Sequence, residues 1–465
     1  MVDIITAIRD PKLFGSLFKN QETWRAWRVY LKALFGLPMD SLERKIFKLY
    51  TGGLTMPPKD QARESYMICG RRSGKSFISA LVAVYLACFR DWSKYLNKGE
   101  VGHIFIIATD RRQARIIKNY ISGIFQASPI LSQMVKADLR ESIELRNNVI
   151  ITVKAATFRG LRGYTLLAAI LEEMAFYRDE ESANPDREIL NAVKPGLATF
   201  PGSLLLGIST PYARSGVLWE QFKKHYGQRN GPLIWKAPTT VMNPTIDKKI
   251  IDQALRDDPE AARAEWEAEW RQDISSLFTI ESIEACVVPG RYELPKIEKV
   301  NYMGFIDPSG GRQDSFTMAI AHAEETGKVV LDVIRERVPP FRPEAVCEEF
   351  TGVLKAYRVS QVQGDRYAGE WVTTSFRKFG IEVKPCEKSA SDLYAEFLPM
   401  IMQGSVELLD SKRLISQLTS LERRTRTGGK DLITHFPSSH DDVANAVAGA
   451  CVLAATPRRP DIIWV

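Results

Sequence analysis

The sequence predicts an α/β protein of two domains, the first built on a parallel sheet and the second on a mixed sheet. The chain has 465 residues, which is more than one ordinary core organises. Short apolar runs alternate with amphipathic helical stretches through most of it, a pattern typical of sheets covered by helices. Near residue 300 three apolar runs instead follow one another through tight turns, which indicates an antiparallel meander.

The first domain is expected to cover residues 1–275. Residues 1–60 have aromatic and aliphatic side chains at helical spacings and end at Pro57-Pro58, so they predict a helical segment of this domain. Residues 61–275 alternate strands with helices over 75–89 and 111–125, and a charged helical stretch ends near Asp273. The expected strands are YMIC, HIFIIAT, VIITV, LLAAIL and LLLGIS.

The second domain is expected to cover residues 300–465, after an irregular linker over 276–299 that contains Pro289 and Pro295. Its first three strands are NYMGFID, FTMAIAHA and GKVVLDVIRERV, and helix, strand, helix and strand follow in EEFTGVLKAY, SQVQGD, WVTTSFRKFG and IEVKPC. A last helix is predicted in SSHDDVANAVAGACVLAA, with Ser438 or Ser439 as its N-cap.

The composition is that of a folded cytoplasmic protein, with 45% hydrophobic and 26% charged residues. A net charge of +7 permits a nucleic-acid partner without requiring one. The six cysteines are scattered and form no C-x-x-C pair, which is typical of thiols in a reducing compartment. The longest apolar run, residues 80–89, is too short to span a membrane, so no membrane association is expected.

The stretch ICGRRSGKSFIS, residues 68–79, lies between an expected strand and an expected helix. It fits the G-x-x-x-x-G-K-[ST] pattern of phosphate-binding loops, except that Cys69 occupies the first glycine position. Lys75 would reach the β- and γ-phosphates, and Ser76 would bind Mg²⁺. The alternative is a strand-to-helix turn with a chance Gly-Lys-Ser. The residues expected at the nucleotide are Gly70, Arg71, Arg72, Ser73, Gly74, Lys75, Ser76 and Phe77.

Two further strand ends carry polar groups. LLAAILEE places Glu172 and Glu173 at the C-terminal end of an expected buried strand, where carboxylates without partners are costly. Glu172 would hold the Mg²⁺ of ATP through water, and Glu173 would orient the attacking water. SLLLGISTP ends in Ser209 and Thr210, which either sense the γ-phosphate or form an ordinary strand end.

A second group of carboxylates lies in the second half. Asp307 ends the strand YMGFI, Asp365 ends SQVQG, and Asp441 and Asp442 precede the last helix. A ribonuclease H-like sheet brings these three places together, where divalent cations would be needed to offset the repulsion. Two Mg²⁺ or Mn²⁺ ions would then activate water and stabilise the leaving oxygen of a phosphodiester. Singly, each acid is an ordinary strand-end or helix-start residue, and Asp314 is either an auxiliary ligand or a turn residue.

The stretch LERRTRTGGKDL, residues 421–432, predicts a basic hairpin around Gly428-Gly429. A charge run is usually a solvated surface, but beside a metal nuclease site it is a candidate clamp on the phosphate backbone of DNA. The cations concerned are Arg423, Arg424, Arg426 and Lys430.

In their order along the chain these motifs resemble the large terminase subunit of tailed double-stranded DNA bacteriophages. They run from about residue 65 to 455 and comprise GRRSGKS, IIATDRRQA, FRGLRGYTLLAAILEEMA, ISTPYARSG, the WEAEW segment, GFIDPSGGRQDS, VQGDRYAG and HDDVANAVA. The resemblance implies a P-loop ATPase of the ASCE type joined to a ribonuclease H-like nuclease. It implies ATP-driven translocation of double-stranded DNA into a procapsid and metal-dependent endonucleolytic cutting of concatemeric DNA.

The resemblance also implies cofactors, roles and partners. The cofactors are ATP with one Mg²⁺ and two Mg²⁺ or Mn²⁺ ions in the nuclease. Ser209-Thr210 would couple hydrolysis to motion, and Arg162 matches a position where some members supply an arginine finger to the next subunit of a ring. The alternative for Arg162 is a salt bridge to Glu172 in its own subunit. The implied partners are the portal protein, the small terminase subunit and other copies of the chain, monomeric in solution and in a ring on the procapsid, in the host cytoplasm and not the mature virion.

Two other interpretations stay open on the sequence. A helicase-like, DNA-dependent ATPase without nuclease activity keeps the first group of motifs and treats the second-half carboxylates as structure. A packaging scaffold with degenerate sites is encouraged by Cys69 and by Glu172, which replaces the usual aspartate. No glutamine motif that would contact the adenine precedes the loop, and the only candidate there is Glu43. In the second half, Asn445 stands where many relatives have a further acid.

Overall fold

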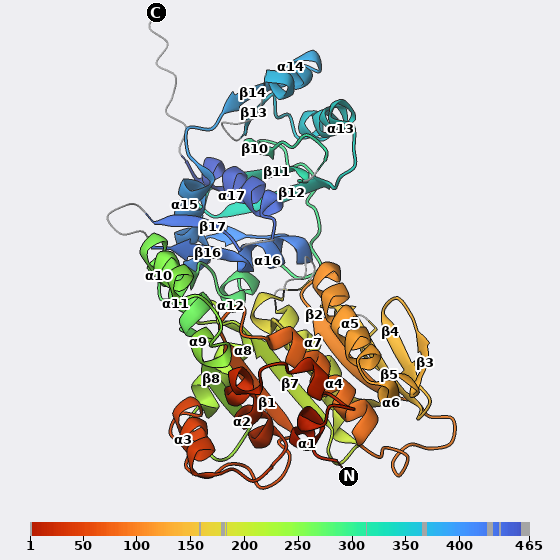
Figure 1. Ribbon diagram of the computed structural model, residues 1–465. Coiled ribbons are helices and arrows are strands. Elements are labelled where there is room, and N and C mark those ends of the chain that lie inside the picture. Colours follow the sequence, from red (N-terminus) through yellow and green to blue (C-terminus); the bar gives the residue numbers. More distant parts are fainter. Residues whose placement is uncertain are drawn as a thin grey trace, which may run out of the picture. The chain divides into compact units, whose positions relative to one another are not determined.

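The computed structural model describes residues 2–157, 160–177, 182, 184–312, 314–364, 370–425, 431–436 and 439–456. The chain forms two compact units, which are residues 1–179 with 184–272 and residues 180–183 with 273–465 (Figure 1). Each unit is an α/β fold with its own sheet, so the predicted fold class is confirmed. Within the described ranges no helix is both long and apolar enough to cross a membrane.

The first unit begins with helices, as residues 1–60 predict. Carboxylates start two of them: Asp3 accepts N–H groups at the start of α1, and Asp40 forms a capping box with Glu43 at the start of α3. The capping box and an ion pair with Lys32 engage Glu43, the one residue offered for the adenine. The elements are α1 (Ile4–Arg9), η1 (Gly15–Leu17), η2 (Gln21–Trp24), α2 (Arg25–Leu34) and α3 (Ser41–Tyr50).

An eight-stranded sheet organises the first unit, in the order β3-β4-β5-β2-β6-β7-β1-β8. The six parallel strands are β1 (Glu64–Cys69), β2 (Gly102–Ala108), β5 (Val149–Ala155), β6 (Leu166–Glu172), β7 (Leu204–Ser209) and β8 (Leu233–Ala237). The antiparallel edge strands β3 (Val135–Asp138) and β4 (Ser142–Leu145) were not predicted. They are short and mostly polar or half-exposed, so they leave no apolar run in the sequence.

Helices cover both faces of this sheet. Along β2, Ile104 and Ile106 pack with α4, α5 and the N-terminal helices, whereas Phe105 and Ile107 pack with α7 and α8. Every side chain of β6 is buried, which explains the continuous apolar run that predicted it. The helices after α3 are α4 (Lys75–Phe89), α5 (Arg111–Gln126), α6 (Pro129–Ser132), η3 (Met174–Phe176), α7 (Pro185–Ala198), α8 (Gly216–His225), α9 (Thr239–Met242), α10 (Lys248–Asp257) and α11 (Pro259–Glu267).

The second unit contains a six-stranded mixed sheet in the order β14-β13-β10-β11-β12-β15. The first three of its strands form the predicted antiparallel meander, and β13 and β14 continue the sheet parallel to the first of them. This arrangement is the one expected for a ribonuclease H-like sheet. The strands are β10 (Tyr302–Asp307), β11 (Phe316–Ala323), β12 (Val329–Arg337), β13 (Gln361–Gly364), β14 (Glu382–Pro385) and β15 (Val406–Glu407).

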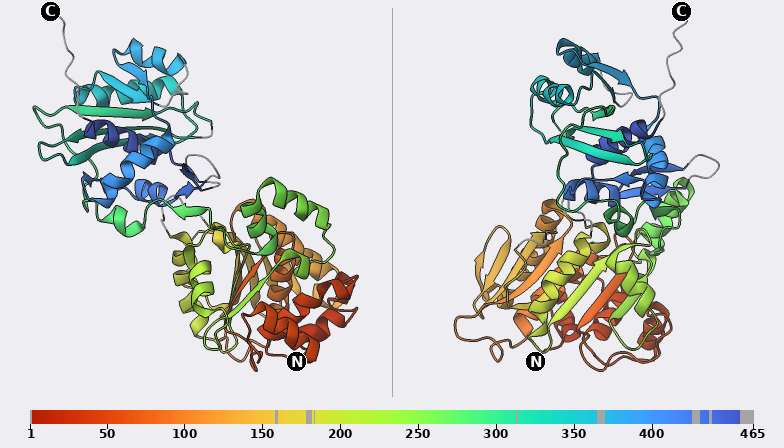
Figure 2. Two further views of the ribbon diagram at one scale, coloured as in Figure 1. Left: turned by 90° about the vertical axis from the view of Figure 1, so that its left-hand side faces the viewer. Right: turned by 180° about the vertical axis from the view of Figure 1, so that it is seen from behind.

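Helices again cover both faces. α13 (Pro343–Ala356) and α14 (Glu370–Lys378) pack on one face, and α12 (Ile280–Glu284), α15 (Ala390–Met402), α16 (Lys412–Thr419) and α17 (Asp442–Ala455) pack on the other (Figure 2). A smaller antiparallel sheet joins β9 (Ile274–Ser276), β16 (Leu421–Arg424) and β17 (Leu432–His435). Residues 276–299, expected to be a linker, supply Leu277, Phe278 and Ile283 to the core of this unit.

The predicted N-cap of the last helix is wrong. The N-cap of α17 is Asp441, and the Ser439 hydroxyl instead donates to the carbonyl of Phe436. Ser438 lies outside the described residues.

Candidate nucleotide and metal sites

The loop between β1 and α4 has the backbone of a phosphate-binding loop. Gly74 has a φ of 96°, and Arg72 has a φ of 58°, so both residues adopt the left-handed conformation and Gly74 does so without a Cβ clash. Cys69 is the last residue of β1 and is fully buried. Its backbone belongs to a regular strand, so a glycine is not required at this position. Burial raises the pKa of its thiol to about 11, which keeps the thiol protonated.

Side chains from distant segments hold the loop by its carbonyl groups. The indole Nε1 of Trp27 donates to Ser73 O at 2.8 Å, Thr239 Oγ1 donates to Arg71 O at 2.8 Å, and Asn243 Nδ2 donates to Arg72 O at 2.8 Å. Loop carbonyls are thus engaged on the protein side, as is the Arg71 N–H, which donates to Glu265 O. The N–H groups of Gly74, Lys75 and Ser76 lie at the start of α4, where an anion can accept from them. Sequence reasoning missed Trp27, Thr239 and Asn243 because nothing local marks a partner so far along the chain.

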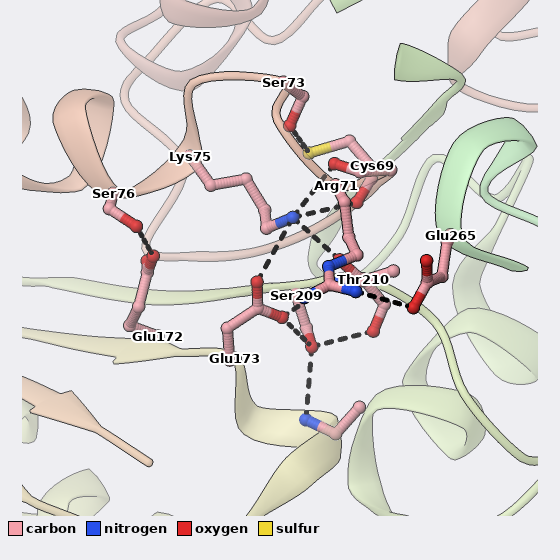
Figure 3. Close-up of polar contacts among 12 residues, drawn as sticks. Cys69, Arg71, Ser73, Lys75, Ser76, Glu172, Glu173, Ser209, Thr210 and Glu265 are labelled. Carbon is pink, nitrogen blue, oxygen red and sulfur yellow. Dashed lines mark hydrogen bonds and ion pairs between the residues drawn. The ribbon is translucent and has the colours of Figure 1, made fainter. Parts of the chain in front are cut away.

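Lys75 lies at the centre of the polar network in Figure 3. Its Nζ donates to Thr210 Oγ1 at 2.7 Å and to Gly70 O at 3.0 Å, and it lies 3.2 Å from Glu173 Oε1. The side chain is only 5% exposed. Burial alone lowers the pKa of this ammonium, but Glu173 and Glu172 outweigh it and raise the pKa overall. The lysine is therefore a fixed cation at the end of β1.

Glu172 ends β6 and has no exposed surface. Its Oε1 accepts from Ser76 Oγ at 2.5 Å, and its Oε2 accepts from Ser79 Oγ at 2.7 Å. Burial, with repulsion from Glu173, raises the pKa of Glu172 to about 7, although the two serine hydroxyls and Lys75 lower it. Ser76 and Glu172, the two predicted partners of the nucleotide's Mg²⁺, are thus in direct contact.

Glu173 follows with a φ of 53°, a left-handed conformation that is costly for a non-glycine residue. That turn places its Oε2 3.0 Å from Thr210 N and 3.1 Å from Ser209 Oγ, both of which donate to it. Ser209 and Thr210, predicted from a weak pattern, therefore join β7 to Glu173 and Lys75. The observed strain and the convergence of strand ends are features of a catalytic site.

The other predicted loop residues have side-chain contacts outside the Lys75 network. Arg71 and Arg72 are exposed, and Arg71 Nη1 pairs with Glu265 Oε1 at 2.8 Å. A Cβ at Gly70 would lie 2.1 Å from Thr239 Oγ1, so only glycine fits there. The Phe77 ring packs against Phe18 and Trp24, with centroids 5.6 and 5.5 Å away, and so contacts the N-terminal segment.

These residues fit a nucleotide with its Mg²⁺. The loop presents N–H groups at the start of α4, a buried cation stands beside them, and a hydroxyl and a carboxylate suited to Mg²⁺ lie in contact. Gln113 Nε2, which donates to Ser76 Oγ at 3.3 Å, adds a polar group to this side that sequence reasoning missed.

Arg162 is exposed and lies four residues before β6, whose first residue, Leu166, pairs with His103 at the start of β2. Glu172 is at the opposite end of β6, about 20 Å away along a strand that rises roughly 3.3 Å per residue. Glu172 is held by serines, and within the described ranges no ion pair involves Arg162. The alternative of a salt bridge between Arg162 and Glu172 is therefore wrong.

In the second unit, α17 brings side chains onto the end of β10. A Cβ at Gly449 would lie 2.4 Å from the Phe305 ring, so a glycine lets the helix approach β10 closely. One turn earlier, Asn445 Nδ2 donates to Asp307 Oδ2 at 2.8 Å. Asn445 is 5% exposed, and its Oδ1 has no hydrogen-bond partner among the described residues. A buried oxygen without a donor beside a carboxylate fits a site for a cation.

Asp441 and Asp442 lie at the start of the same helix. Tyr394 OH donates to Asp441 Oδ2 at 2.8 Å, and Ser315 N donates to Asp442 Oδ2 at 3.3 Å. Thr317, which pairs with Asp307 in the sheet, donates its hydroxyl to Asp442 O. Burial raises the pKa of Asp442 to about 6, and the neighbouring Asp441 adds to the rise. The structure thus brings three of the five predicted aspartates to the N-terminal part of α17.

The remaining predicted ligands are less fully described. Asp365 lies outside the described residues, and β13 before it ends at Gly364, opposite Ile306. Asp314 is exposed, with its Oδ1 3.5 Å from His440 Nδ1. The described side chains, which do not include Asp365, contain no group of three or more His, Cys, Asp or Glu residues that could hold a metal ion.

The basic hairpin exists as the pair of β16 and β17. Arg423 pairs with Asp431 at 2.5 Å, and Arg424 pairs with Glu422 at 3.3 Å. Arg426 and Lys430, at the expected turn, lie outside the described residues.

The first unit has the sheet order, loop and strand-end acids of a P-loop ATPase, and the second is a mixed-sheet domain with gathered carboxylates. Residues 55–224 match the family model for the ATPase domain of the terminase large subunit. The resemblance of the motifs to the phage terminase large subunits is therefore confirmed. No curated protein sequence matches the chain.

Solved structures of phage terminases resemble it. The large terminase of bacteriophage HK97 is 15% identical, with 92% of this chain and 100% of that chain covered and a TM-score of 0.38. The large terminase of a thermophilic bacteriophage is 11% identical, with 84% and 93% covered and a TM-score of 0.37. The large terminase nuclease of another thermophilic phage, G20c, is 16% identical, with 38% and 96% covered and a TM-score of 0.33. The G20c nuclease has also been solved with magnesium, and the terminase of the first thermophilic phage with ADP.

Proposed function

We propose that this chain hydrolyses ATP in its first unit to move double-stranded DNA into a procapsid, and cuts concatemeric DNA in its second unit with divalent metal ions. The observation that carries the ATPase half is the joining of three strand ends by Lys75, Glu173 and Thr210, with Ser76 against Glu172 beside them. These contacts support a site of ATP hydrolysis around this loop.

Each group in the first unit has a definite task. Lys75 and Ser76 would hold the phosphates and the Mg²⁺, which would offset the charge that develops during phosphoryl transfer. Glu173 would orient the attacking water, and the ion pair with Lys75 holds its carboxylate in place. Ser209 and Thr210 hold the other side of that carboxylate, so a change at the γ-phosphate reaches β7.

The nuclease half rests on Asp307, Asp441 and Asp442, with Asp365 as the further ligand expected from the sequence. Two Mg²⁺ or Mn²⁺ ions bound there would supply an activated water and stabilise the leaving oxygen. Asn445 and Ser315 orient the carboxylates of Asp307 and Asp442, and the basic hairpin would hold the DNA backbone.

Arg162 is proposed to complete the ATP site of a neighbouring copy in a ring on the procapsid. Its exposure and its distance from its own Glu172 support a role outside its own subunit. The portal protein, the small terminase subunit and the host cytoplasm are the partners and the location that this function requires.

Plasmid cleavage by the purified chain in Mn²⁺ without ATP tests the proposal. We expect nicking and linearisation that EDTA abolishes, together with ATP turnover in a separate assay. ATP turnover without cleavage would favour a helicase-like, DNA-dependent ATPase, and absence of both activities would favour a packaging scaffold.

A further inference from the structure

The start of α17 is capped in an unusual way. Asp441 occupies the N-cap position, where an aspartate ordinarily accepts the N–H of the third helical residue, here Ala444. Its side chain makes no capping hydrogen bond. The Ala444 N–H instead donates to Gln417 Oε1 at 2.9 Å, an acceptor supplied by α16. The cap of this helix is therefore provided from outside it.

The side chain of Gln417 has one described hydrogen bond, the one that its Oε1 accepts from Ala444. The side chain is 5% exposed, and its Nε2 finds no acceptor among the residues that the structure describes. Burying a glutamine amide with an unmet donor is unfavourable compared with burying an apolar side chain of the same size. Gln417 therefore contributes one acceptor oxygen at the N-terminus of α17.

The carboxylate of Asp441 is held elsewhere as a result. Tyr394, a fully buried residue of α15, donates its hydroxyl to Asp441 Oδ2 at 2.8 Å. The other oxygen, Oδ1, lies 3.9 Å from His435 Nε2. One oxygen is thus oriented by the neutral Tyr394 hydroxyl, and the other accepts no hydrogen bond from the residues that the structure describes.

We infer that Gln417 and Tyr394 are positioning residues of the metal site: Gln417 caps α17 so that Asp441 need not, and Tyr394 orients the released carboxylate for a divalent cation. This inference rests on the proposed nuclease function. If Gln417 loses its acceptor, the Asp441 side chain can turn to cap Ala444, which restores the helix end and withdraws a ligand. Loss of Gln417 then weakens metal binding more than it weakens the fold.

Mn²⁺ binding to the full chain, followed by the electron paramagnetic resonance signal of free Mn²⁺, tests this without an activity assay. Gln417→Met keeps the size but removes the acceptor, and Tyr394→Phe removes only the hydroxyl. Each should raise the Kd for Mn²⁺ by about 10–100-fold, the usual effect of removing a group that orients a ligand. Gln417→Glu, which keeps an acceptor, should stay within a few-fold of the natural chain, as should the exposed control Gln403→Met.

A thermal cycle in EDTA tests the capping exchange itself. Both arms use the Tyr394→Phe background, so that Asp441→Ala leaves no buried hydroxyl unpaired. There Asp441→Ala should barely change the Tm, because Asp441 makes no cap. With Gln417→Met added, the same substitution should lower the Tm by several degrees, because Asp441 has become the cap. Equal Tm changes in both backgrounds, or an unchanged Mn²⁺ Kd in Gln417→Met, would overturn this inference and leave the nuclease proposal standing. A natural chain that binds no Mn²⁺ would overturn the nuclease proposal as well.

Discussion

The buried carboxylate of Glu172 should make the first unit less stable as the pH rises. Its pKa is about 7 in the folded protein, against about 4.3 for an exposed glutamate. The folded state therefore binds its proton more tightly than the unfolded state. The resulting stability is fully present below about pH 4 and is lost as the pH rises through 7.

The change in the free energy of unfolding follows from the difference between the folded and unfolded pKa values of Glu172. Each pKa unit corresponds to about 1.4 kcal/mol, so the full effect is about 3 to 4 kcal/mol, of which about 2 to 3 kcal/mol falls between pH 5 and 8. The variant Glu172→Gln cannot ionise and should lose this part of the pH dependence.

The assay is urea unfolding in EDTA without nucleotide at pH 5, 6, 7 and 8, followed by the fluorescence of buried first-unit tryptophans such as Trp27 and Trp235. The free energy of unfolding of the natural chain should fall toward pH 8 relative to Glu172→Gln. The exposed control Glu141→Gln should follow the natural chain. Parallel profiles for the natural chain and Glu172→Gln would refute the assignment of a raised pKa to this residue.

Three further outcomes are expected. Glu173→Gln should bind ATP but not hydrolyse it, because only the group that orients water is changed; steady turnover in a malachite green assay would contradict this. Replacing Arg423 and Arg424 by alanine should weaken DNA binding and lower the slope of log K against log salt by up to about one for each phosphate that an arginine had neutralised, whereas an unchanged slope would leave the hairpin as a solvated loop. Arg162→Ala should lower the ATP turnover rate of assembled rings by a factor of about 10³–10⁵. Mixing Arg162→Ala subunits with Lys75→Ala subunits should restore part of that turnover. No recovery in mixtures shown to co-assemble would exclude a role of Arg162 in trans.

Much of the fold was predictable because its central strands are buried on both faces. The continuous apolar runs of β6 and β7 reflect that burial directly. The edge strands β3 and β4 were missed because half-exposed strands of four residues carry mixed side chains. Residues 276–299 were taken for a linker because prolines mark breaks in secondary structure, not the absence of core contacts.

The candidate sites were predictable where chemistry and strand ends coincide. An acid pair after a buried strand has few structural explanations, so Glu172 and Glu173 were found. Trp27 and Gln417 were missed because each acts through a hydrogen bond to a segment distant in sequence. The cap of α17 was assigned to a local serine for the same reason: local pattern cannot show that another helix supplies the acceptor.

Reciprocal loss of two activities tests the central claim most directly. ATP turnover and Mn²⁺-dependent plasmid cleavage should be measured on purified Lys75→Ala and Asp307→Asn chains beside the natural one. We predict that Lys75→Ala loses ATP turnover and still cuts plasmid, whereas Asp307→Asn loses cleavage and still hydrolyses ATP. Full ATP turnover by Lys75→Ala, or full cleavage by Asp307→Asn, would contradict the account of two separate catalytic sites on one chain.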